Sequence, residues 1–201
     1  MTTYAKTDAG IELHDAGFWQ RINGTWHEKA LWAFMAVVIA HWAEHIIQGA
    51  QIWLFDMERA DSLGGLGYFA PWLVSSEALH FGFAIVMLSG LIALRPGFHG
   101  KSRKWWDISL ALQGWHFVEH SVLLAQVIIG TNLFGSPVPT SLLQPFVPRA
   151  ELHLFYNLIV FAPMVVAMWL HTRPDQDHAN GCTCATPDAR GQMSDASLQN
   201  S

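Results

Sequence analysis

Two five-residue clusters with the order His-x-x-Glu-His lie within apolar segments, one at His41 to His45 and one at His116 to His120. On an α-helix, positions i, i+3 and i+4 fall within about one third of the circumference, so each cluster presents its three ionisable side chains on one face. Imidazole and carboxylate together are typical ligands of transition metals. An unsatisfied ionisable group inside a membrane costs ~2.5 kcal/mol or more, which makes both clusters functional candidates. A hydrogen-bonded polar network without metal is the structural alternative.

Two further histidines, His80 and His153, occur in two other apolar segments at related positions. If all four segments are helices packed together, six imidazoles and two carboxylates converge on one chamber. Glu44 and Glu119 are in addition the predicted catalytic groups, as bridging ligands or proton acceptors. The predicted metal ligands are His41, Glu44, His45, His80, His116, Glu119, His120 and His153.

Other polar residues near these positions are supporting candidates. Glu77 lies one turn before His80 and is an additional ligand, a proton carrier or an interface residue. Asn157 lies one turn after His153 and is a candidate for hydrogen bonding around the ligands. Gln51 and Gln126 project from the triad faces about two turns beyond the glutamates, where hydrogen bonding between helices is their expected role. Glu151, on the opposite side of its helix from His153, is expected to cap the helix N-terminus.

The segments that must position these residues resemble membrane spans. The chain of 201 residues is 51% hydrophobic and 13% charged, whereas charged residues make up about 25% of a soluble domain. Apolar runs at 31–55, 71–94, 105–129 and 151–171 are each long enough to cross a bilayer, which needs ~20 residues. These features predict an all-α, integral membrane four-helix bundle. The net charge of −5 gives no basic surface for nucleic acid.

An internal repeat relates the two halves of the chain. An offset of 75 positions superimposes the two clusters and also pairs Lys29 with Lys104 and Gln51 with Gln126, for seven identities within 29–51. The repeat predicts two tandem, pseudo-symmetric helix hairpins, at about 29–94 and about 104–171, whose pairing creates a common interior.

The distribution of Lys and Arg predicts the orientation of the chain. The segment before the first span and the loop between the second and third spans carry most of the basic residues, so both termini are expected in the cytoplasm, with the chain in the cell (inner) membrane. Residues 1–28 are predicted to be a cytoplasmic or interfacial segment without a cleaved presequence, and 172–201 a disordered cytoplasmic tail. Cys182 and Cys184 in this tail form no disulfide framework, although with His178 they offer copper or zinc ligands.

The first functional hypothesis is a membrane metalloenzyme with a dinuclear centre. Two transition-metal ions are expected, iron first, with zinc or copper as alternatives. Such a centre within the bilayer would oxidise or hydroxylate a lipophilic small molecule, with an electron-transfer partner or a larger membrane complex supplying electrons. The arrangement is similar in logic to carboxylate-bridged di-iron bundles, but the order of ligands differs and assigns no family.

Three other hypotheses remain open. Haem-based electron transfer would pair His80 with His153, although His at i and i+4 lie only ~6 Å apart along a helix and leave no room for two porphyrins. Zinc hydrolysis is suggested by the order His-x-x-Glu-His, which is the inverzincin pattern and occurs here twice. Metal transport would use the same side chains as a transient ion site.

Overall fold

A computed structural model describes residues 17–173, and these form helices and connecting loops with no strand in that range. The four long helices are α2 (His27–Trp53), α5 (Glu77–Leu94), α6 (Gly100–Ile129) and α7 (Arg149–His171). The short elements are α1 (Phe18–Ile22), α3 (Leu66–Phe69), α4 (Pro71–Ser75) and the 3₁₀ turns η1 (Arg95–Gly97) and η2 (Leu133–Gly135). Residues 1–16 and 174–201, with His178, Cys182 and Cys184, lie outside the described part.

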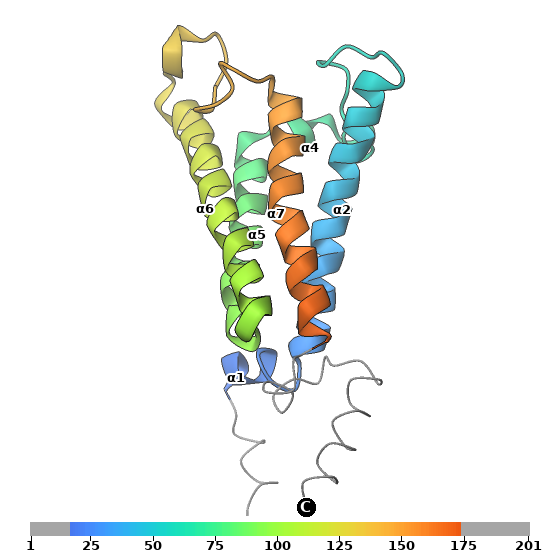
Figure 1. The fold of residues 1–201 in the computed structure, drawn as a ribbon. Coiled ribbons are helices and arrows are strands. Elements are labelled where there is room, and N and C mark those ends of the chain that lie inside the picture. Colours follow the sequence, from blue (N-terminus) through green and yellow to red (C-terminus); the bar gives the residue numbers. More distant parts are fainter. Residues whose placement is uncertain (1–16, 174–201) are drawn as a thin grey trace, which may run out of the picture.

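The four long helices run side by side (Figure 1). Helix α7 packs against both α6 and α2, and α5 packs against α6 and, over a smaller area, α2. Two long loops, 54–76 and 130–148, lie at the same end of the helices, whereas α1 lies at the other end. We call 54–76 the first long loop and 130–148 the second long loop.

The half of the bundle further from the long loops has an apolar core. The Trp106 indole is fully buried, stacks on Phe98 at 4.1 Å between ring centroids, and donates a hydrogen bond of 2.8 Å to the Leu91 carbonyl. Such close packing fixes the relative positions of the helices, and so of the residues they carry. The core comprises Leu31, Phe34, Met35, Val38, Met87, Leu91, Leu94, Phe98, Trp106, Val160, Met164 and Ala167.

Three helical segments are long and apolar enough to span a membrane: His27–Trp53, Glu77–Gly97 and Arg149–His171. They identify a candidate membrane protein. Helix α6, which covers the predicted third span, is not among them, because most of its buried residues are polar. Its outward side chains Ile108, Trp115 and Val118 are nevertheless exposed and apolar. The buried polar residues of α6 are Ser102, Ser109, Gln113, His116, Glu119, His120 and Gln126.

The second predicted span, 71–94, is divided in the structure. Ser76 takes an extended conformation that ends α4, and its Oγ accepts a hydrogen bond of 3.3 Å from the Leu79 amide at the start of α5. Serine at this position satisfies an amide that has no partner within the helix. His80 therefore lies in the first turn of α5, close to the long loops. A continuous span from residue 71 would place His80 deeper in the bundle, whereas the observed α5 begins at Glu77 and places it near the end of the bundle.

Candidate metal centre

Five histidines from three helices meet in the half of the bundle nearer the long loops. They form two groups of three in which one nitrogen from each side chain lies within 4.8 Å of the others. The first group is His41, His45 and His153, and the second is His116, His120 and His153. His153 belongs to both groups, so the structure gives one continuous cluster with two positions that could hold a metal ion.

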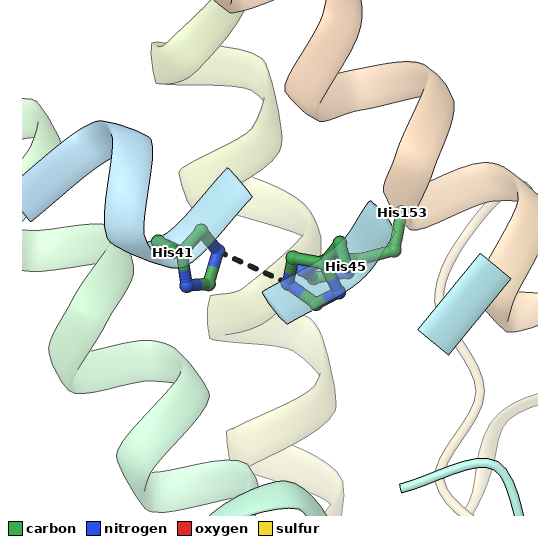
Figure 2. Close-up of side chains that lie close together, drawn as sticks. All are labelled: His41, His45 and His153. Atoms are coloured by element: carbon green, nitrogen blue, oxygen red, sulfur yellow. Dashed lines mark hydrogen bonds between the residues drawn. The ribbon is translucent and has the colours of Figure 1, made fainter. Parts of the chain in front are cut away.

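The first group joins α2 to α7. His41 and His45 lie on the same face of α2, one turn apart, with their Nε2 atoms 3.1 Å from each other. His153 reaches toward them from α7, and its ring centroid lies 4.4 Å from that of His45 (Figure 2). The ring of Phe83, from α5, stacks on His41 at 3.6 Å between centroids and covers one side of the group.

The second group joins α6 to α7 and is more deeply buried. The Nε2 atoms of His116 and His120 lie 3.2 Å apart, and the two ring centroids are 5.0 and 5.1 Å from that of His153. A cavity of about 20 Å³, room for one water-sized occupant, is lined by these three histidines together with Glu119 and Tyr156.

Several polar atoms around the second group are buried without a hydrogen-bond partner. They are Nδ1 of His116, Nδ1 of His120 and Oε1 of Glu119. A buried polar atom left unpaired costs about 1–3 kcal/mol, and such atoms commonly mark the position of an ion or a water. The unpaired Glu119 oxygen and the cavity therefore give the second group a carboxylate donor and space for a bound ion beside the Nε2 pair.

His80 lies beside the cluster and belongs to neither group. Its ring is parallel to that of His120, with centroids 6.0 Å apart, and is 5.9 Å from His153. Its Nδ1 lies 2.9 Å from the Ser76 carbonyl in the turn before α5. This contact occupies Nδ1 of the His80 ring, so Nε2 is the nitrogen of His80 that could bind a metal ion.

Glu44 and Glu119, the predicted carboxylate ligands, each bind a long loop. Oε1 of Glu44 accepts hydrogen bonds of 2.7 and 3.3 Å from the amides of Leu66 and Gly67 in the first long loop. Oε2 of Glu119 accepts one of 3.0 Å from the amide of Leu142 in the second. The structure thus brings neither glutamate into the histidine groups, although Glu119 keeps one oxygen unpaired at the second group.

Gln51 and Gln126 also bind the long loops, where hydrogen bonding between helices was expected. The Gln51 side chain accepts from the Gly64 amide at 2.7 Å and donates to the Gly64 carbonyl at 3.1 Å. Gln126 makes the same pair of bonds with Thr140, at 3.2 and 2.9 Å. Each glutamine lies six residues after the last histidine of its triad, and each fixes the loop that follows its own helix.

Replacing Gly64 with Ala is expected to destabilise the protein, because Gly64 has φ +75° and a Cβ there would overlap the Glu44 carboxylate. A non-glycine residue in this conformation alone costs about 1–2 kcal/mol. Gly130→Ala is the matched control, since Gly130 has φ +72° and open space around its Cβ position. Thermal unfolding in detergent should show a larger loss for Gly64→Ala. Equal losses would mean that the Glu44 contact contributes nothing.

The remaining predicted residues are placed as follows. Glu77 makes two hydrogen bonds, of 2.5 and 2.7 Å, with the Arg149 guanidinium and is nearly buried. Asn157 donates to the His153 carbonyl at 3.0 Å and so binds the backbone of the turn that carries that ligand. Glu151, in the first turn of α7, accepts two hydrogen bonds from Arg59, which raise the pKa of that guanidinium.

Comparison with protein-family models, with curated proteins and with solved structures finds no match for the chain. The geometry of the histidine cluster and the chemistry of its surroundings therefore carry the functional conclusion.

Two cavities reach the cluster from different sides and share His45, Gln48, Leu63 and His80 in their walls. One, of about 530 Å³, is largely apolar and lies between α2, α5 and the first long loop. The other, of about 290 Å³, is more polar and is lined by Arg59, Ser62 and Arg149 among others. Phe83 and Gln48 line these cavities, and Tyr156 lines the small cavity of the second group. None of the three was predicted, because no spacing signal distinguishes them from ordinary packing residues.

Proposed function

We propose that the chain is a multi-pass membrane metalloprotein whose histidine cluster holds a dinuclear centre that oxidises a lipophilic substrate. The sharing of His153 by two three-histidine groups carries this proposal, in which His153 would lose its ring proton and offer one ring nitrogen to each position. Two nitrogen ligands at ~2.1 Å from one ion lie about 3.0–3.4 Å apart when the nitrogen–metal–nitrogen angle lies between its octahedral and tetrahedral values. The Nε2 separations of 3.1 and 3.2 Å within the two helical pairs fit chelation of one ion by each pair.

The tandem-hairpin, four-helix membrane architecture belongs to the same proposal. Equivalent contacts in the two halves support it, since Glu44 and Glu119 bind backbone amides of their loops and Gln51 and Gln126 bind Gly64 and Thr140 in the same way. The exposed apolar face of α6 supports this helix as the fourth span. Both termini would then lie in the cytoplasm, by the distribution of basic residues.

Iron is the metal we propose, with zinc and copper as the alternatives that imidazole ligands also suit. The unpaired oxygen of Glu119 offers the second group a carboxylate donor, and mixed imidazole and carboxylate ligands are typical of non-haem iron. Glu44 and Glu119 remain the proposed proton acceptors.

The proposed reaction is hydroxylation with dioxygen as the oxidant. One oxygen atom enters a C–H bond of the substrate, and the other leaves as water with two protons and two electrons from an external donor. The metal ions supply the redox chemistry when bound. The chain's own contribution is to hold the substrate beside the histidines and to accept or donate protons at Glu44 or Glu119. The electron donor is a partner protein or a larger membrane complex.

Elemental analysis and an absorption spectrum of protein purified without chelators test this proposal. We expect about two iron ions per chain and no Soret band. The double variant His116→Ala/His120→Ala should retain about one ion, because the first group stays intact. Zinc alone would replace the oxidase with the hydrolase hypothesis, and a Soret band would favour haem. Protein without any metal would leave only the hydrogen-bonded polar network.

A further inference from the structure

The larger cavity lies between two helices that are both long and apolar enough to span a membrane, α2 and α5. Its walls include Leu79, Phe83 and Val86 from α5 and Leu63 and Leu66 from the first long loop. Its volume of about 530 Å³ falls within the ~300–1,000 Å³ typical of sites for one small ligand. The polar part of its wall comprises His41, Glu44, His45, Gln48 and His80, so a ligand there would touch the first histidine group.

We propose that this cavity binds the hydrocarbon chain of a single-chain lipid taken directly from the bilayer, a proposal that rests on the proposed function and names its substrate class. Leu79 and Val86, on α5, are 39% and 48% exposed, and in a membrane they face hydrocarbon. An alkyl chain therefore moves from one apolar environment to another without crossing water. A phospholipid, with two chains and a headgroup, exceeds the volume.

The two cavities together orient such a ligand. The polar cavity meets the apolar one at His45, Gln48 and His80. It is lined by Arg59 and Arg149, whose guanidiniums pair with Glu151 and Glu77. The chain lies in the apolar cavity beside Phe83, which stacks on His41, and the polar end of the lipid lies toward the arginines. The part of the chain next to the polar end is then closest to the metal-binding histidines.

Gly82 gives a direct way to close the apolar cavity. It lines the cavity, and a Cβ built on it meets nothing within 4 Å. A leucine there fills the cavity without a backbone clash and gains helix propensity, since glycine is about 1 kcal/mol unfavourable in a helix. Gly114 on α6 is a matched control: it is also helical, has open space around its Cβ position, and lines none of the three cavities described above.

The experiment uses palmitic acid with a photoactivatable diazirine near its carboxylate, added to the full-length protein in lipid nanodiscs. Crosslinked residues are located by mass spectrometry, and metal content is measured on the same samples. We expect crosslinks within 41–48, 63–66 and 79–86. Their yield should fall about tenfold in Gly82→Leu, a loss of ~1.4 kcal/mol in binding, and stay unchanged in Gly114→Leu. Metal content should be the same in all three proteins.

A second variant keeps the test decisive if Gly82→Leu does not fold. Val86→Trp narrows the cavity from a half-exposed position on α5 and should lower the same crosslinks. Crosslinks spread over the outer faces of the helices, or insensitive to both substitutions, would overturn the lipid site even in metal-loaded protein. Localised crosslinks in protein that binds no metal would instead keep the lipid site and overturn the metal centre.

Discussion

His153→Ala is expected to abolish binding of both metal ions, lowering the metal content from about two ions per chain to nearly none. His153 is the one residue common to both histidine groups, with ring centroids 4.4 to 5.1 Å from His45, His116 and His120. Without it each position keeps only two imidazoles from a single helix, and α7 no longer contributes a ligand to either. Elemental analysis after equilibration with iron measures the loss.

Two comparisons make the His153 result specific. His41→Ala should lower metal content to about one ion, since it affects the first group alone. His99→Ala should leave the metal content unchanged, because His99 is an exposed residue at the N-terminus of α6 and belongs to neither group. A His153→Ala protein that folds and retains two ions would contradict a shared ligand and with it the dinuclear centre.

Arg149→Met is expected to lower the free energy of unfolding by about 2 kcal/mol or more. The guanidinium makes two hydrogen bonds with Glu77, whose side chain is only 10% exposed, and so joins the first turns of α5 and α7. Removing one partner of a buried pair typically costs 3–5 kcal/mol, and the 39% exposure of Arg149 reduces this figure. Unfolding in mixed detergent micelles, followed by circular dichroism, gives the change.

The double variant Glu77→Gln/Arg149→Met separates the buried charge from the lost contact. It should recover part of the stability, because no unpaired carboxylate is left between the helices. Arg59→Met is the matched control, because Arg59 also forms an ion pair with a residue of α7, Glu151. Arg59 is 57% exposed, so its substitution should lower the free energy of unfolding much less. Equal effects of the two arginine substitutions would show that burial of Glu77 does not determine the cost.

Much of the architecture was readable from hydropathy and spacing. The observed α2, α6 and α7 begin within five residues of the starts of the predicted spans. Long continuous apolar runs of this kind are typical of helices. The break at Ser76 was not predicted, since serine and the residues around it fit a helix equally well by pattern. Convergence of six histidines was predicted from helical spacing and from the depth of each residue in its span. The structure groups five of them, and His80 lies beside the groups.

The roles of the carboxylates were harder to read from the sequence. Helical spacing puts Glu44 and Glu119 on the same face as the histidines, but it does not show what lies opposite that face. The long loops return over the helices and offer free backbone amides, which bind the glutamates. The conformation of a loop depends on contacts that periodicity does not encode, so these partners could be found only in the structure.

His80 and His153 occupy corresponding places in the proposed repeat, yet only His153 belongs to the histidine groups, while Nδ1 of His80 lies against the Ser76 carbonyl. The two histidine groups also differ in their surroundings, since Phe83 covers the first and Glu119 and Tyr156 line the cavity of the second. Iron should therefore load stepwise, with two distinct dissociation constants, and the better-enclosed α6 position should fill first. This inequality would give the proposed dinuclear centre a defined order of assembly.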